Sequence, residues 1–320
     1  MLCINRTGWW KFMIKYYKTI QNKTVNINDY EPNCWVNCIA PSEDEINFLM
    51  NKFGLEPEFL RASLDEEESS RIDIEDNVAL MIIDSPVINK AGKNLTYYTT
   101  PLSIMLTEHD IITISLKENS IVEEFSENLI RNAHPENRVM FALQIMIRVA
   151  AKYLQYLKQI NKITERVEEK LKKTMKDKEL IQFLEIKKSL VYFSASLKAI
   201  CGVMGKVSRG RYIKLDEEEL EMLEDVSIEF KQASEMAETY EHVVTSTMDA
   251  FSSIISNNLN IVMKILASIT LILSIPTIIS GIYGMNNPGI PLMNYWPFPF
   301  ILMAVSMFIT WAILKKKDMI

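Results

Sequence analysis

The chain has 320 residues, 24% of them charged, and a formal net charge of −6. This acidic balance argues against nucleic acid as a partner, and the length predicts about two domains. The four cysteines lack paired CxxC spacing and the three histidines are scattered, which favours reduced cytosolic thiols over a zinc site. No Ser-His-Asp, Cys-His or phosphate-loop constellation appears, so the protein is predicted not to be an enzyme.

The first half of the chain alternates strand-like and helical patterns. Residues 1–12 lack the apolar core of a signal peptide and are interpreted as an N-terminal extension. Ser42 followed by Glu45 forms a capping box, which predicts that a helix begins there. Runs rich in β-branched and aromatic residues predict strands at 14–20, 34–39, 78–83, 97–106 and 111–116. The predicted fold is an α+β cytosolic domain, a mixed sheet with flanking helices.

The middle of the chain favours long helices. Two are predicted at 137–175 and 178–207, the second ending at a glycine-rich break, Gly202, Gly205 and Gly210. A third tract begins near Asp216 and contains no Gly or Pro before Pro276. Its heptad pairs predict parallel partners along one seam: Leu223/Val226, Phe230/Ala233, Ala237/Tyr240, Val244/Thr247, Phe251/Ile254 and Asn258/Ile261. One stalk helix over 216–283 is expected, the alternative being several shorter helices folded back on one another.

The last quarter of the chain predicts a membrane hairpin. No Asp, Glu, Lys, Arg or His occurs over residues 265–314, enough for two apolar spans at about 265–283 and 298–314. Prolines and glycines in the intervening segment, 284–297, argue against one continuous helix. Lys264 and Lys315 to Lys317 flank the spans, so both chain ends are expected in the cytoplasm. The alternative is a buried hairpin in a soluble core.

Small and polar residues recur on one face of the first span. Thr270, Ser274, Thr277 and Gly281 are spaced by three or four residues, and Asn260, Met263, Leu266 and Ala267 fall on about the same side. Such a face either packs against another helix or lines a pore. The expected continuation into the heptads favours a pore shared by symmetric copies, with Met263 and Leu266 as an apolar constriction. Pro276 is either a hinge for gating or a tolerated kink.

The tetrapeptide Tyr283-Gly284-Met285-Asn286, at the end of the first of two C-terminal spans, closely resembles the motif of the CorA family of magnesium transport proteins. The resemblance extends over the chain after its first dozen residues. It implies a homopentamer in the cell membrane that admits Mg²⁺ and is closed by cytosolic Mg²⁺. Gly284, Met285 and Asn286 would form the selectivity filter, and Asn260, Met263 and Thr277 match pore-lining positions. Asp225 matches a regulatory metal ligand, and Lys315, Lys316 and Lys317 match a basic collar.

The chain also departs from the family pattern. The segment after the motif, 287–291, carries no acid, which weakens the attraction of cations to the pore mouth. Arg61-Ala62 stands where adjacent acids are usual, so that Asp65 and Glu66 to Glu68 either replace them or form a solvated helix end. Ser274 replaces an apolar pore residue. These departures affect regulation and ion selectivity.

The expected segments are an extension (1–12), the α+β domain (13–136), long cytosolic helices (137–210), a stalk and first span (214–283), an external loop (284–297), the second span (298–314) and a basic end (315–320). The expected partners are further copies, the lipid bilayer and divalent cations. The alternatives are cobalt, nickel or zinc transport, the last resembling ZntB and disfavoured by Met285, and a membrane-anchored scaffold or sensor that conducts nothing.

Overall fold

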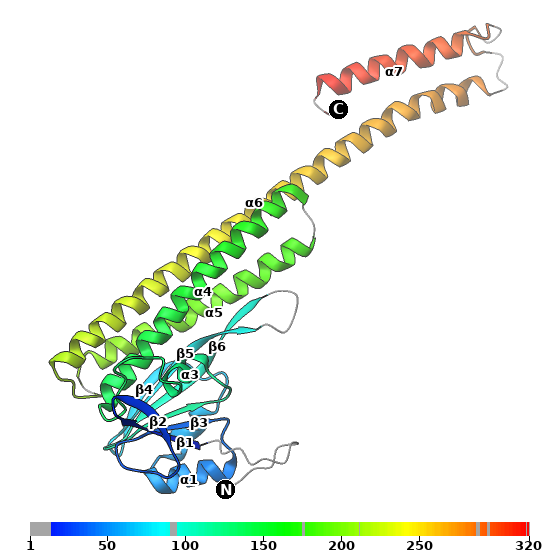
Figure 1. Cartoon of the computed structure of the whole chain (residues 1–320). Coiled ribbons are helices and arrows are strands. Elements are labelled where there is room, and N and C mark those ends of the chain that lie inside the picture. Colours follow the sequence, from blue (N-terminus) through cyan, green and yellow to red (C-terminus); the bar gives the residue numbers. More distant parts are fainter. Residues whose placement is uncertain are drawn as a thin grey trace. The chain divides into compact units, whose positions relative to one another are not determined.

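The computed structural model describes residues 14–89, 95–174, 177–210, 212–285, 289–292, 295–317 and 319 (Figure 1). The predicted extension 1–12 lies outside these residues. The chain divides into two compact units, Met1–Thr245 and Ser246–Ile320.

A seven-stranded mixed sheet organises the first unit, as predicted. Its strands run in the order β2-β1-β3-β7-β6-β5-β4, with β3 and β7 parallel and the other pairs antiparallel. The strands are β1 (Ile14–Ile20), β2 (Lys23–Ile27), β3 (Trp35–Ile39), β4 (Arg71–Glu75), β5 (Val78–Asn89), β6 (Thr96–Leu106) and β7 (Ile111–Ser115). The predicted strands are confirmed, whereas β2 and β4 were not predicted and β5 extends beyond its predicted end.

One side of the sheet packs against two short helices, α1 (Glu43–Phe53) and α2 (Pro57–Ser63). The predicted capping box is present: the Ser42 hydroxyl accepts from the Glu45 amide, and the Glu45 carboxylate accepts from the Ser42 amide at 2.9 Å. The core beneath these helices includes Leu49 of α1 and Phe59 of α2. A further helix, α3 (Ser120–Ser126), follows β7.

Cys34 and Cys38 belong to the same core and are fully buried. Burial raises the pKa of each thiol to about 12.

Between about pH 9 and 12 these thiols keep their protons in the folded chain and lose them in the unfolded chain, so the free energy of unfolding should fall as pH rises. The expected slope is at most about 1.4 kcal/mol per pH unit for each thiol. Denaturant unfolding at several pH values should show a shallower decline for Cys38→Ala; an unchanged slope would contradict the prediction.

The long helices α4 (Arg138–Thr174) and α5 (Asp177–Val207) pack on the sheet. The Ser189 hydroxyl accepts from the Tyr97 amide at 3.2 Å, and the Phe193 ring lies against Tyr97 and Tyr153. The predicted end of this helix at residue 207 is confirmed. The helix passes through Gly202 and Gly205 to Val207, and Gly210, at φ 67°, follows its end.

The third long helix, α6 (Glu217–Tyr283), is a single helix of 67 residues, as predicted. Its heptad seam, however, is already covered within one chain. Leu223, Val226, Phe230, Ala233, Ala237 and Val244 are all at most 2% exposed. The prediction that parallel copies pack along this part of the seam is therefore wrong, because helices of the same chain occupy it; Figure 1 shows the first half of α6 beside α4 and α5.

Candidate functional site

Three helices among the described residues are long and apolar enough to cross a membrane. One is α5, but half of its apolar window is buried inside the first unit. The other two windows, in α6 and in α7 (Phe298–Lys316), have mean hydropathies of 2.2 and 1.8 and are almost entirely exposed. These are the spans predicted from the sequence. Exposed apolar helices of this length are typical of membrane-spanning segments.

Within the second unit, one side of α6 faces the rest of the hairpin. Ser268 and Ile279 are buried there, and the Ser268 hydroxyl donates to the Met319 carbonyl at 3.2 Å. The connection folds back on the end of α6, where the Tyr283 hydroxyl donates to the Pro291 carbonyl at 3.2 Å. The Tyr283 and Phe298 rings lie 6.2 Å apart. These contacts fix which face of α6 the hairpin uses.

The predicted polar stripe lies on the other side of α6. At about 100° per residue, Thr270, Thr277 and Gly281 point roughly opposite to Ser268 and Ile279. All three are exposed, and Ser274 is half-exposed. The stripe is therefore not the surface through which this hairpin holds itself together. The stripe can therefore either contact another molecule or line a water-filled pore.

The hydroxyls of the stripe already donate their hydrogens to the helix that carries them. Thr270, Ser274 and Thr277 donate to the carbonyls of Leu266, Leu271 and Leu273 at 2.8, 2.8 and 3.2 Å. A hydroxyl has one hydrogen and two lone pairs, so the outward part of each group can only accept. A row of acceptors suits the water shell of a hydrated cation, because that shell presents hydrogens outward.

The end of the stripe that contains Met263 and Leu266 is also exposed. Asn260 and Ala267 are exposed, and Met263 and Leu266 are 55% and 57% exposed. Ser256, four residues before Asn260, is exposed on the same face. The sequence reasoning stopped at Asn260, although the spacing of four is the signal that extends the stripe to Ser256.

The stripe does not continue the heptad seam, contrary to the sequence prediction. A seven-residue repeat drifts by about 20° per heptad around a straight helix. Ser268, seven residues after Ile261, is therefore on the side facing the hairpin, where it is buried, away from Thr270 and Thr277. The predicted link between the heptad seam and the stripe is therefore wrong, because the two lie on different sides of this part of α6.

The glycine of the motif closes the end of α6. The Gly284 amide donates to the Ser280 carbonyl at 2.9 Å, and a Cβ at Gly284 would approach that carbonyl oxygen to 3.0 Å. Glycine therefore allows the backbone to pass here without a clash. Met285 is 59% exposed. Asn286, the third predicted filter residue, lies outside the described residues.

The remaining predicted site residues belong to other segments of the chain. Asp225 is exposed on α6 in the first unit, and Lys315, Lys316 and Lys317 are exposed at the end of α7. Among the described residues, no group of three or more His, Cys, Asp or Glu side chains is arranged to hold a metal ion. Glu66 pairs with Lys117 at 2.5 Å, and Glu68 with Arg71 at 3.2 Å, which favours the solvated-end interpretation of these acids.

Comparison with known proteins shows that this chain is similar to known transport proteins. The "Cobalt/magnesium transport protein CorA" of Methanocaldococcus jannaschii is 29% identical over 293 residues, covering 88% of this chain and 90% of the relative. The complete structure of the CorA magnesium transporter from that organism superposes with a TM-score of 0.80 at 25% identity, over 96% of this chain and 97% of that chain.

A more distant structure shares the fold alone. The ZntB cytoplasmic domain from Vibrio parahaemolyticus matches with a TM-score of 0.61 at 13% identity, covering 77% of this chain and 99% of that chain. The family described as CorA-like Mg²⁺ transporter protein matches residues 31–316. With most of its length matched, the chain belongs to the CorA-like Mg²⁺ transporter family and is a membrane transport protein, not an enzyme.

Proposed function

We propose that this protein is a homo-oligomeric channel through which divalent cations, foremost Mg²⁺, enter the cell. Copies of α6 would surround a common axis with their polar stripes turned inward. The observation that carries this proposal is the stripe of Thr270, Ser274 and Thr277, which faces away from the hairpin and presents only acceptors. A lipid-facing position gives no reason for such a stripe.

The number of copies and the topology come from the resemblance and from the charges at the ends of the spans. A pentamer is proposed, with the segment 284–297 outside the cell membrane and both chain ends in the cytoplasm. Lys264 and Lys315 to Lys317 support this orientation, since lysines concentrate on the cytoplasmic side. Inward movement would be driven by the membrane potential, about 2.3 kcal/mol per charge per 100 mV.

Mg²⁺ is the proposed principal ion, and cobalt or nickel are proposed as further substrates. Mg²⁺ releases its water shell reluctantly, so a neutral carboxamide such as that of Asn286 can hold it through that shell. The printed name of the M. jannaschii relative includes cobalt as well as magnesium. Zinc transport is the second candidate; Met285, in place of the isoleucine of the ZntB-like motif, argues against it.

The proposal also includes regulation of the channel by cytosolic Mg²⁺. Asp225 is exposed and supplies one carboxylate, so a site there needs further ligands from a neighbouring copy. We predict that Asp225→Ala weakens the closing effect of internal Mg²⁺, because one charged ligand is lost. The measurement is flux against internal Mg²⁺ concentration, with Asp249→Ala, another exposed acid of α6, as the control. Equal inhibition of the wild type and Asp225→Ala would contradict a regulatory role for Asp225.

The test of the function is Mg²⁺ influx into proteoliposomes under an inside-negative potential, with Co²⁺ and Zn²⁺ as competing ions. The proposal predicts influx that increases with the potential and is reduced by Co²⁺. Flux of Zn²⁺ alone would favour the zinc alternative. Absence of flux for every ion, from a verified folded oligomer, would leave the scaffold or sensor.

A further inference from the structure

A polar cavity lies between α5 and the strands β5 and β6 in the first unit. Its volume is about 520 Å³, within the range of about 300–1,000 Å³ that is usual for small-molecule sites. None of its described lining residues is basic, whereas four are acids: Glu66, Glu67, Glu68 and Asp84. Each charged side chain described in this lining is therefore an acceptor, which suits a ligand that carries positive charge.

Asp84 of β5 supplies a carboxylate that is largely withdrawn from water. Its backbone is held in place, because its amide donates to the Ser70 hydroxyl at 3.0 Å and its carbonyl accepts from the Tyr153 hydroxyl at 2.9 Å. Burial raises the pKa of the Asp84 carboxyl above its ordinary value, and the hydroxyls of Ser196 and Ser70 beside it oppose this shift. No cation of the described residues pairs with this carboxylate. A bound cation would supply the missing counter-ion.

Two of the other acids already have partners from outside the lining. Glu66 pairs with Lys117 at 2.5 Å, and Glu68 pairs with Arg71 at 3.2 Å. Glu67 is exposed, and its carboxylate forms no hydrogen bond or ion pair within the described part of the chain. It is therefore the second carboxylate of this cavity without a counter-ion.

The remaining walls of the cavity are aromatic or small. They are formed by Tyr98 of β6 and by Tyr192, Ala195 and Ala199 of α5. Tyrosine rings attract cations, and the Lys188 ammonium already lies 5.8 Å from the Tyr192 ring centroid. Such walls also accommodate methylene groups, which a hydrated metal ion does not have. Because no three His, Cys, Asp or Glu side chains of the described residues are grouped to hold a metal ion, the lining favours an organic cation.

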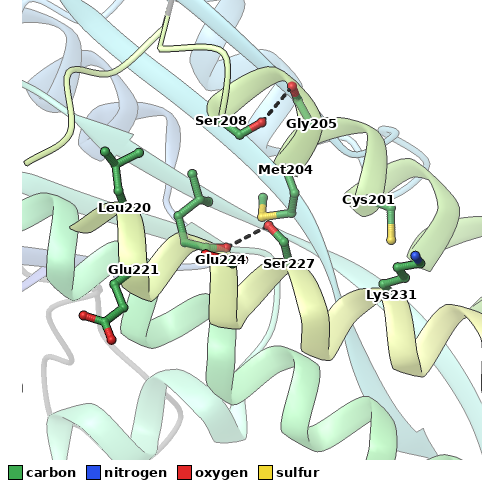
Figure 2. A pocket seen from close by; sticks show the side chains of 10 residues that line it. Cys201, Met204, Gly205, Ser208, Leu220, Glu221, Glu224, Ser227 and Lys231 are labelled. Carbon is green, nitrogen blue, oxygen red and sulfur yellow. Dashed lines mark hydrogen bonds between the residues drawn. The ribbon is translucent and has the colours of Figure 1, made fainter. Parts of the chain in front are cut away.

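A second cavity, between α5 and α6, has a different lining (Figure 2). The buried side chains of Met204 and Leu223 contribute to it, and so does the base Lys231. Its Ser227 hydroxyl already donates to the Leu223 carbonyl at 2.7 Å. Glu224 is an exposed acid of this second lining, and it therefore provides a control for the loss of one carboxylate elsewhere on the chain.

We propose that the cavity at Asp84 binds an organic polycation, an aliphatic diamine or polyamine. One ammonium group would lie at the Asp84 carboxylate and a second at Glu67, with the methylene chain against the tyrosine rings. Each terminal ammonium group donates up to three hydrogen bonds, which the carboxylates and hydroxyls of the lining can accept. The inference goes beyond the proposed channel and does not depend on it, because the cavity belongs to the first unit of a single chain.

The test is isothermal titration calorimetry of the full chain in detergent, with putrescine, butylamine and MgCl₂ as separate probes. We expect putrescine to bind the wild type more tightly than butylamine, which has a single ammonium group. Asp84→Asn should weaken putrescine binding by about tenfold or more, because a largely buried charged acceptor is lost, whereas Glu224→Gln should leave it unchanged. Glu67→Gln should weaken the binding of putrescine by up to about fivefold, because this acid is exposed, and should leave butylamine binding unchanged.

Equal putrescine binding by the wild type and Asp84→Asn would overturn the site, and so would an equal loss in Glu224→Gln. Binding of Mg²⁺ that depends on Asp84, without binding of putrescine, would overturn the assignment of an organic ligand. A second variant covers the case in which Asp84→Asn fails to fold, as judged by circular dichroism. Ala195→Trp narrows the cavity from its α5 wall and removes no carboxylate. It should weaken putrescine binding, and unchanged binding by folded Ala195→Trp would overturn the proposal.

Discussion

Replacing Asn286 with alanine should reduce Mg²⁺ influx to the level of protein-free liposomes while leaving the oligomer and its expression unchanged. In the sequence, Asn286 follows Gly284 and Met285, just after α6 ends at Tyr283. Its carboxamide oxygen is the neutral acceptor proposed to hold hydrated Mg²⁺ at the outer mouth, and alanine has no acceptor to replace it.

The neighbouring residue provides the control. Asn287→Ala removes a carboxamide of the same size one position further along, outside the motif. The account predicts flux close to the wild type for this variant. Equal flux in Asn286→Ala and the wild type would contradict the filter, and equal loss in both variants would show that the whole loop, not Asn286, is required.

The second large effect concerns stability. Phe230→Ala should lower the free energy of unfolding by about 3–5 kcal/mol, the usual cost of removing a buried aromatic ring. Phe230 is 0% exposed in a single chain, so the loss is expected in dissociated as well as assembled protein. Urea unfolding of the full chain in detergent, followed by circular dichroism, measures it.

Ile228, two residues earlier on the same helix, is the matched control. It is 55% exposed, and Ile228→Ala should change stability by no more than about 0.5 kcal/mol. If Phe230→Ala altered the assembly of copies but left the unfolding of single chains unchanged, the heptad seam would join copies after all. That result would contradict its burial within the chain.

The strands that the sequence predicted are those with buried, β-branched runs, such as β7. The missed strands are edges: only Ile72 is buried in β4, and β2 follows a turn at Gln21 and Asn22, which take positive φ without a glycine to indicate it. The strand β5 extends beyond its predicted end, because a proline such as Pro86 is not expected inside a strand. Pairing with β4 ends at Ile82, so Pro86 lies where that side of β5 has no partner strand and no ladder bond is lost.

For the helices, the apolar periodicity of the sequence predicts the helix itself but not its packing partner. The heptads of α6 correctly indicated one long helix with one buried side, because apolar spacing determines which residues share a face. Spacing does not identify the partner, and Phe230 and Ala233 pack within their own chain. The direction of the stripe also needed the structure, since Ser268 and Ile279 define the side that the hairpin covers.

The central claim is that the stripe of α6 borders an aqueous path. The most direct measurement is the block of Mg²⁺ flux by a positively charged, water-soluble thiol reagent in Thr277→Cys, compared with Ile279→Cys on the hairpin side and with the wild type. The account predicts that the reagent stops flux in Thr277→Cys and has little effect on the other two. Block in Ile279→Cys, with Thr277→Cys unaffected, would contradict it.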